Sequence, residues 1–389
     1  MHTAVIVDVV RTPSGRGKPG GALSGIHPVD LAAEVLRATL ERNGLASTQV
    51  DDVLLGCVSQ VGEQTMNVAR QAVLAAGFDE RVPATTIDRQ CGSSQQAAHF
   101  AAQGVISGQY DVVIAGGVES MSRVPLGVAA SVAGSPFSPG LRARYPDGLV
   151  NQGVSAELIA ARWGFSREEL DAFAAESHER AAEAQAQGRF ASQMLAVAGV
   201  TADETVRPGT TVAALAGLAP AFRTDAAAQR FPEIDWRITP GNSSPLTDGA
   251  SAALIMSEER ALELGLTPRA RFHAFAVVGD DPLLMLTGPI PATRRILERS
   301  GLTIDDLDAY EVNEAFASVP LAWAAELGAD AAKLNPWGGA IALGHALGSS
   351  GTRLLGTLLA HLEATGGRYG LQTMCEGGGM ANATIIERL

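Results

Sequence analysis

Two distant stretches of the chain repeat one order of predicted elements. In the first, a turn that carries Cys91 precedes a helix and then a strand that ends in a glycine pair. In the second, a glycine-rich turn that carries His345 precedes a helix and then a strand that ends in three glycines. Each unit is too small for a full core, so the repeat predicts two like α/β halves packed face to face, with Cys91 and His345 as neighbours near a pseudo-twofold axis. The predicted strands of the two units are 111–117 and 369–374, and the second helix is 352–363.

The rest of the chain favours strands that alternate with helices, which indicates a layered α/β sheet. Predicted strands are 4–10, 53–58, 250–256, 269–279 and 307–313, and predicted helices are 30–43, capped by Asp30, and 67–76. Between 119 and 247 this rhythm fades, and only the helical runs 155–163 and 167–187 are clear. We therefore expect an N-terminal half over 1–118 that is completed by 248–268, a cap over 119–247, and a C-terminal half over 269–389.

The composition of the chain excludes several classes of partner and site. The chain has 389 residues and a net charge of −13, which argues against a nucleic-acid or anionic-membrane partner. We expect no membrane span, and no signal peptide before the strand-like N-terminus. Its three cysteines (Cys57, Cys91 and Cys375) show no C-x-x-C spacing, so we expect neither disulfides nor a metal site. Free thiols indicate a reducing compartment, and we expect the cytoplasm.

Cys91 is the candidate nucleophile. It precedes a helix, with Ser93 or Ser94 as the expected N-cap, so the helix dipole should favour the thiolate. Gly92 should leave room for a substrate carbonyl to approach the backbone. His99 is a poor base for this thiol, because eight helical residues span roughly 12 Å. Cys57 is expected to be core.

His345 and Cys375 supply the proton chemistry. A neutral imidazole near Cys91 can accept the thiol proton and leave a nucleophilic thiolate. Cys375 ends the last predicted strand, and the glycines after it could turn their N–H groups toward a developing oxyanion. A second thiol suits proton transfer to and from carbon, because a cysteine pKa lies within reach of neutrality.

Seven separated motifs resemble those of the thiolase family, the acetyl-CoA acyltransferases, and the degradative bacterial members in particular. They are Arg11-Thr-Pro, Cys91-Gly-Ser-Ser, Gly116-Gly-Val-Glu-Ser-Met121, Gly241-Asn-Ser-Ser-Pro-Leu-Thr-Asp-Gly249, Asn313-Glu-Ala-Phe-Ala317, Gly338-Gly-Ala-Ile-Ala-Leu-Gly-His345 and Cys375-Glu-Gly-Gly-Gly-Met380. The resemblance covers essentially the full length. It implies a five-layer αβαβα core with the cap over the active site.

The resemblance also implies the catalytic roles. Cys91 would attack the C3 carbonyl of a 3-ketoacyl-CoA after activation by His345. Cys375 would protonate the departing acetyl-CoA (or propionyl-CoA) carbanion and later deprotonate CoA. Asn313 would hold a water that forms one oxyanion hole with His345. The N–H groups of Cys91 and Gly377 would form the second.

The substrate side is implied in the same way. Ser244 would bind the pantetheine arm, Met285 and Phe316 would line the acyl pocket, and Gln152 is a further candidate contact. Ala219-Pro-Ala-Phe222 lacks the arginine usual for the family's nucleotide-end contact, so Arg223, Arg230 or Arg237 could replace it, and Arg223 is our candidate. The stretch Asn151-Gln-Gly153 lacks the histidine common in short-chain thiolases, which favours longer, bulkier or steroid-like acyl chains. Ala346 replaces the usual proline after His345, which should loosen that turn.

The resemblance implies no metal or prosthetic group, with CoA as co-substrate. It implies a homodimer or homotetramer, and possible partner enzymes of β-oxidation. The same catalytic residues would serve the reverse Claisen condensation of two acyl-CoAs. A ketoacyl synthase would present a second histidine where this chain has Cys375. A non-catalytic acyl-CoA- or lipid-binding member, or a scaffold, is the alternative from another class; retention of both cysteines, His345 and Asn313 argues against it.

Overall fold

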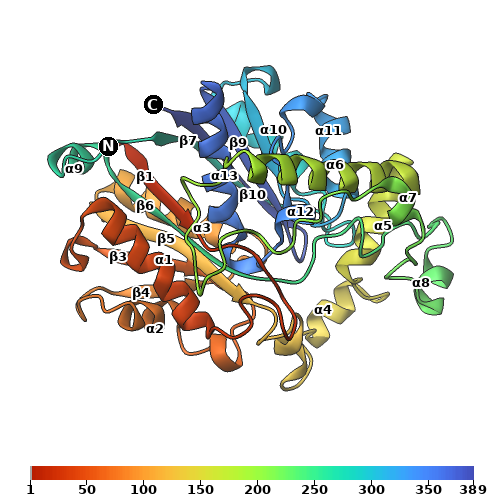
Figure 1. The fold of residues 1–389 in the computed structure, drawn as a ribbon. Coiled ribbons are helices and arrows are strands. Elements are labelled where there is room, and N and C mark those ends of the chain that lie inside the picture. The colour runs from red at the N-terminus through yellow and green to blue at the C-terminus, as the bar shows by residue number, and fades with distance from the viewer. Residues whose placement is uncertain (1) are drawn as a thin grey trace.

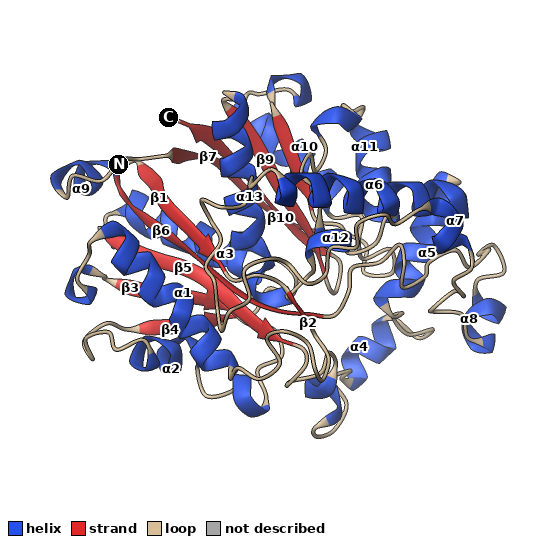
Figure 2. Ribbon diagram, in the orientation of Figure 1, coloured by secondary structure: helices blue, strands red, loops and turns tan. Residues whose placement is uncertain are grey.

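In the computed structural model, which describes residues 2–389, two mixed β-sheet halves flank a central pair of helices (Figures 1 and 2). The strand order is β4-β3-β5-β6-β1-β7-β10-β9-β8, and β2 pairs with β6. Strands are β1 (Ala4–Arg11), β2 (Gly15–Arg16), β3 (Asp52–Gly56), β4 (Ala84–Ile87), β5 (Val112–Ser120), β6 (Thr247–Ser257), β7 (Ala270–Gly279), β8 (Ala309–Val312), β9 (Tyr369–Glu376) and β10 (Met380–Arg388). Helices are α1 (Pro28–Asn43), α2 (Val68–Ala75), α3 (Ser93–Ser107), α4 (Pro139–Arg144), α5 (Gln152–Trp163), α6 (Arg167–Ala186), α7 (Val212–Ala216), α8 (Asp225–Arg230), α9 (Glu258–Glu263), α10 (Pro289–Ser300), α11 (Ser318–Leu327), α12 (Ala340–Leu343) and α13 (Ser350–Thr365).

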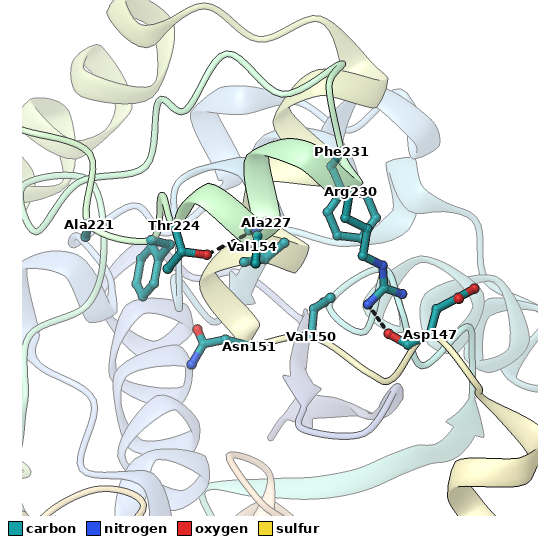
Figure 3. A pocket seen from close by; sticks show the side chains of 11 residues that line it. Asp147, Val150, Asn151, Val154, Ala221, Thr224, Ala227, Arg230 and Phe231 are labelled. Carbon is teal, nitrogen blue, oxygen red and sulfur yellow. Dashed lines mark hydrogen bonds between the residues drawn. The ribbon is translucent and has the colours of Figure 1, made fainter.

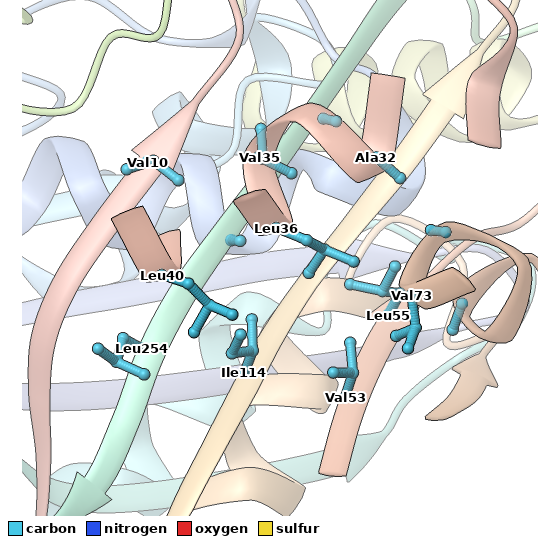
Figure 4. Packing of buried hydrophobic residues seen from close by; sticks show 14 of the residues in the cluster. Val10, Ala32, Val35, Leu36, Leu40, Val53, Leu55, Val73, Ile114 and Leu254 are labelled. Carbon is cyan, nitrogen blue, oxygen red and sulfur yellow. The ribbon is translucent and has the colours of Figure 1, made fainter. Parts of the chain in front are cut away.

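The halves are built as five layers. Helices α1 and α2 cover the outer face of the N-terminal strands, where Leu36 and Leu40 pack onto Val53 and Ile114 (Figure 4). Helices α3 and α13 pack against each other between the two halves. Helices α10 and α11 cover the far face of the C-terminal strands, around Trp323. Burial of a continuous apolar stripe on each helix holds these layers together.

The two halves also join edge to edge, which the sequence did not predict. Strands β1 and β7 pair antiparallel over two residues, Val5 with Arg271 and Ile6 with Ala270. This short pairing makes one continuous ten-stranded sheet out of the two halves. The sheet therefore fixes their relative placement, in addition to the packing of α3 on α13.

Several predicted boundaries need correction. Helix α1 begins at Pro28 and is capped by the His27 side chain, so Asp30 lies inside the first turn. There its negative charge interacts favourably with the positive end of the helix dipole. Strand β5 runs to Ser120, past the boundary expected at 118. Strand β10 was missed, although it pairs with both β7 and β9. No helix within residues 2–389 is both long and apolar enough to cross a membrane.

The segment between β5 and β6 carries α4 to α8 and packs mainly on the C-terminal half. Helix α5 contacts α11, and α6 contacts α12. Apolar residues of α5 and α6 share a buried cluster with Phe316 and Cys375. The segment therefore lies beside the end of β9 that carries Cys375.

Candidate active site

The N-termini of α3 and α13 lie side by side, which brings the two predicted turns together. Ser94 Oγ on α3 accepts a hydrogen bond of 3.1 Å from the N–H of Thr352 on α13. A Cβ on Gly351 would collide with the backbone of α3, so only glycine allows this approach. Cys91, ahead of α3, packs in one buried cluster with Leu347, two residues after His345.

His345 is a neutral base whose tautomer is fixed by its neighbours. Ser350 Oγ donates to the Ala346 carbonyl at 2.9 Å, so its lone pair accepts from the His345 Nδ1–H at 2.7 Å. His345 Nε2 then keeps a lone pair, which faces the Asn313 amide nitrogen at 3.3 Å. Burial and the nearby Arg353 lower the pKa of His345 to about 3.

Burial overrides the helix dipole at both thiols. It raises the pKa of Cys91 to about 12, with a further increase from the nearby Glu376, and hydrogen bonds from Gln152 and the Gly377 N–H oppose this shift. Burial likewise raises the pKa of Cys375 well above its usual range. The prediction that the helix dipole favours a resting thiolate at Cys91 is therefore wrong, and burial moves the pKa of Cys375 away from neutrality. Both thiols rest as neutral S–H groups.

The surrounding turn also differs in detail from the prediction. Gly92 is the N-cap of α3, and Ser93 Oγ instead donates to the Gln90 carbonyl at 2.6 Å. The space beside Gly92 is not open to substrate, because a Cβ there would collide with Glu376 Oε1. Cys57 is buried, as expected. His99 is also buried, and its Nε2 bonds Thr384 at 2.7 Å.

Asn313, Cys375 and Gly377 reach the site from adjacent C-terminal strands. Asn313 follows β8, Cys375 lies near the end of β9, and Gly377 begins the turn into β10. The charge of Cys91 raises the pKa of Cys375, so the two thiols lie near each other. The side-chain oxygen of Asn313 has no hydrogen-bond partner and is free to accept from a bound water or ligand.

Two buried glutamates inside the sequence motifs hold the turns, a role that the sequence analysis missed. Glu119 accepts from the N–H groups of Val58, Ser59 and Gly348, and from Gln64 Nε2. It therefore joins the end of β3 to the turn after His345.

Glu314 plays the same part on the other side. It accepts from Ser177 Oγ, Asn335 Nδ2 and the N–H of Ile341. It therefore joins α6 to the start of the His345 turn through hydrogen bonds. Both residues lie within quoted motifs, which was the available signal, but a lone glutamate in a sequence usually indicates a solvated surface.

Two family models match almost the whole chain: "Thiolase, N-terminal domain" matches residues 4–259 and "Thiolase, C-terminal domain" matches residues 266–388. The chain belongs to the thiolase family. It is therefore an acyltransferase, and the thiolase fold expected from the motifs is confirmed.

Known thiolases match over their full length. The chain is 48% identical to the steroid 3-ketoacyl-CoA thiolase FadA6 of Mycobacterium tuberculosis, over 100% of this chain and 95% of that protein. It is 45% identical to the 3-ketoacyl-CoA thiolase of Vibrio cholerae serotype O1, over 100% of both. The crystal structure of the Bacillus anthracis acetyl-CoA acetyltransferase superimposes with a TM-score of 0.88 at 38% identity, over 100% of this chain and 99% of that one.

This thiolase has a cavity of about 560 Å³ in the cap (Figure 3). Its walls come from α8 and from the segment that leads into α5. Apolar side chains dominate, and Arg230 is the cationic residue among those that line it. Arg230 donates to the Asp147 and Gly148 carbonyls, the latter at 2.9 Å, and its guanidinium lies 4.8 Å from the Phe231 ring centroid. The lining residues are Asp147, Val150, Asn151, Val154, Ala221, Phe222, Thr224, Ala226, Ala227, Arg230 and Phe231.

An aromatic path leads from this cavity toward the thiols. The Phe222 ring packs edge-on against Phe316 at 5.8 Å, and Phe316 shares a buried cluster with Met285 and Cys375. Met285 has a left-handed backbone (φ 50°), an uncommon conformation for a residue that is not glycine.

The remaining predicted contacts fall in different places. The Ser244 N–H donates to the Ala315 carbonyl at 3.0 Å, which places this serine beside the Phe316 segment. Gln152 opens α5 and contacts Cys91. Arg223 is exposed beside Asp225 and does not line the cavity, whereas Arg230 does. Within residues 2–389, no group of three or more His, Cys, Asp or Glu is placed to hold a metal ion.

Proposed function

We propose that this thiolase cleaves 3-ketoacyl-CoA with CoA, in the degradative direction, through a thioester on Cys91. The two products are acetyl-CoA, or propionyl-CoA from an α-methyl substrate, and an acyl-CoA shortened accordingly. The names of the relatives support this assignment over a non-catalytic acyl-CoA-binding protein. CoA is a co-substrate, and the proposed steps use only side chains and N–H groups of this chain.

The first half-reaction moves two protons and breaks one carbon–carbon bond. His345 Nε2 takes the Cys91 proton, and Sγ attacks C3 of the substrate. The C2–C3 bond breaks, its electron pair passes to C2, and Cys375 protonates C2 so that acetyl-CoA leaves. Asn313, through a water, and His345 stabilise one oxyanion, and the N–H groups of Cys91 and Gly377 stabilise the other.

The second half-reaction restores every proton. The Cys375 thiolate takes the proton of CoA–SH, and the CoA thiolate attacks the thioester carbonyl. The Cys91 thiolate leaves and recovers its proton from His345. Because each transfer is between neighbouring groups, the free enzyme is regenerated without an outside acid or base.

The observation that carries this proposal is the hydrogen-bond arrangement of His345. Ser350 satisfies Nδ1, so the lone pair at Nε2 is directed to the side of Asn313, where a thiol proton can be accepted. A pKa of about 3 keeps the imidazole neutral, and hence able to accept that proton, throughout the physiological range.

We place the nucleotide end of CoA in the cap cavity, with Arg230 rather than Arg223 meeting a phosphate. The cavity volume of about 560 Å³ lies in the range of cofactor sites. A chain of net charge −13 needs a local cation to hold this anion, and Arg230 is already oriented by two backbone carbonyls. The pantetheine arm would follow Phe222 and Phe316 to Cys375, with Ser244 beside it and Met285 and Gln152 near the acyl group.

The acyl group we propose is long or bulky, a steroid side chain included. One relative is named for a steroid substrate, and the chain lacks the histidine of short-chain members. Three free, buried cysteines support a reducing cytoplasm. A homodimer or homotetramer, and partner enzymes of β-oxidation, are proposals that rest on family resemblance alone.

Intact-mass spectrometry tests the central claim. The protein is incubated with a 3-ketoacyl-CoA without free CoA, as wild type, Cys91→Ala and Cys57→Ala. We expect a shortened acyl adduct on wild type and on Cys57→Ala, whose buried thiol belongs to the core. Cys91→Ala should carry none.

A series of 3-ketoacyl-CoAs with short, long and steroid-like acyl groups is then ranked by the rate of adduct formation. An adduct on folded Cys91→Ala would refute the role of Cys91. Absence of any adduct on wild type with the whole series would refute the proposed reaction.

A further inference from the structure

A buried carboxyl group lies directly behind the nucleophile. Glu376 is the last residue of β9, its side chain is fully buried, and neither carboxyl oxygen has a hydrogen-bond partner. Oε1 occupies the place where a Cβ of Gly92 would stand, so the group lies against the residue that follows Cys91. An unpaired carboxylate in such a place costs several kcal/mol, roughly, whereas the neutral acid costs far less.

The neighbouring Asn382 offers an acceptor for that acid. Its Nδ2 donates to the Gly92 carbonyl at 3.0 Å, which turns Oδ1 toward the same spot and leaves it without a partner. Oδ1 would lie 2.9 Å from a Cβ on Gly92, the position that Glu376 Oε1 crowds. Two acceptor oxygens facing each other repel, whereas a protonated Glu376 can donate to Oδ1. Asn382 Nδ2 lies 2.7 Å from the same Cβ position, and a proton on Glu376 adds Oδ1 as an acceptor that the carboxylate cannot use.

The charged groups around Glu376 do not reverse this preference. Arg89, whose Nε has no partner, favours the ionised carboxylate, and Asp88 disfavours it. Burial outweighs both and raises the pKa of Glu376 to about 8. A negative charge on this carboxyl raises the pKa of both Cys91 and Cys375.

We propose that Glu376 is a positioning residue for catalysis: as a neutral acid it lets the Cys91 thiolate form, and its ionisation at alkaline pH blocks that step. The inference rests on the proposed role of Cys91 as nucleophile. Its sign follows from Coulomb's law, since a carboxylate beside the thiolate repels it and slows the transfer of the thiol proton to His345. Acylation should therefore fall as pH rises.

The test is the single-turnover rate of acyl-adduct formation between pH 6.5 and 9.5, read by intact mass. We expect the wild-type rate to fall up to about tenfold from pH 7 to pH 9. The reason is that the fraction of Glu376 in the neutral form falls about tenfold over this range when its pKa is near 8. Glu376→Gln keeps shape and neutrality, so its rate should change less than about twofold over that range. Glu311→Gln is the matched control: Glu311 is fully buried, its pKa is also raised to about 8, and it is not among the groups that act on the pKa of Cys91.

Three outcomes decide the matter. An alkaline fall in Glu376→Gln equal to that of wild type would overturn the inference. So would loss of acylation at every pH in a folded Glu376→Gln, because the residue would then be needed for more than neutrality. If wild type forms no adduct at all, it is the role of Cys91 that fails.

A measurement on the carboxyl itself covers the case in which Glu376→Gln does not fold. Infrared difference spectra of Glu311→Gln, which removes the buried acid whose pKa is also raised to about 8, should show a protonated carboxyl band that disappears with the same midpoint as the rate. A band already absent at pH 7 would overturn the inference.

Discussion

Replacing Ala346 by proline tests how the His345 turn is held. The family motif carries a proline at this place, which led us to expect a loosened turn. The structure instead places Ala346 at φ −71° and ψ 100°, within the range that proline adopts. Its carbonyl accepts from the N–H and hydroxyl groups of both Ser349 and Ser350. Within residues 2–389 its own N–H donates to no protein acceptor, so proline removes no bond.

The expected gain in the free energy of unfolding comes from an effect on the unfolded chain. A proline that fits the native conformation stabilises by about 0.4–1 kcal/mol, because it restricts the unfolded state. For a chain of this size that corresponds to an increase in Tm of about 0.5–1 °C. A small cavity with room for about one water molecule borders Ala346, beside Ser349 and Arg353, so the ring has space on that side. The rate constant kcat should be unchanged, because Ser350 and Asn313 hold the imidazole independently.

Thermal melts and steady-state kinetics of Ala346→Pro check both numbers. Ala342→Pro is the matched control, because the Ala342 N–H donates to the Gly339 carbonyl at 3.1 Å and its loss should lower Tm. A tenfold drop in kcat, or a fall in Tm, for Ala346→Pro would refute the reasoning. The turn would then require a freedom or a contact that proline removes.

Four further results are expected. Ser350→Ala should lower kcat about tenfold, the equivalent of one lost hydrogen bond to Nδ1, with KM nearly unchanged in steady-state assays. Because the pKa of His345 is about 3, the rate kcat/KM should show no acid limb between pH 5 and 8; a limb near 6.5 would contradict a fully buried imidazole. Cys375→Ala should still accept an acyl group from a preformed acyl-CoA but fail to turn over; normal cycling would refute its role. Arg230→Ala should raise KM for CoA about tenfold, and the exposed Arg223→Ala should not; equal effects would exclude the proposed phosphate contact.

The proximity of the Cys91 and His345 turns could be predicted from the sequence because a repeat places equivalent residues at equivalent positions. Order of elements alone put the Cys91 turn beside the His345 turn, and hydrophobic periodicity gave most strands. Strand β10 was missed because its run (Met380–Arg388) directly follows three glycines, and the prediction assigned no element beyond them. The pairing of β1 with β7 could not be foreseen, since two residue pairs leave no pattern in the sequence.

Burial explains the errors at the site. The helix-dipole argument predicted a lowered pKa for Cys91 because it neglected desolvation, which is the largest effect on this fully buried thiol. The same omission hid Glu119, Glu314 and Glu376, because a glutamate is normally exposed and only tertiary structure shows where one is enclosed. The sequence therefore led to the residues that we propose react, and the three-dimensional structure showed which buried residues surround them.

These shifts share one consequence: the resting site carries almost no charge. Cys91 and Cys375 rest as thiols, His345 as neutral imidazole, and Glu376 as neutral acid at pH 7. An ion pair between Cys91 and His345 is unfavourable in this buried space until a substrate carbonyl takes up the electron pair and donors such as the Gly377 N–H stabilise the oxyanion. The thiolate is thus coupled to the presence of substrate. A free enzyme built in this way keeps its nucleophile protected from oxidants, since the thiolate is the susceptible form.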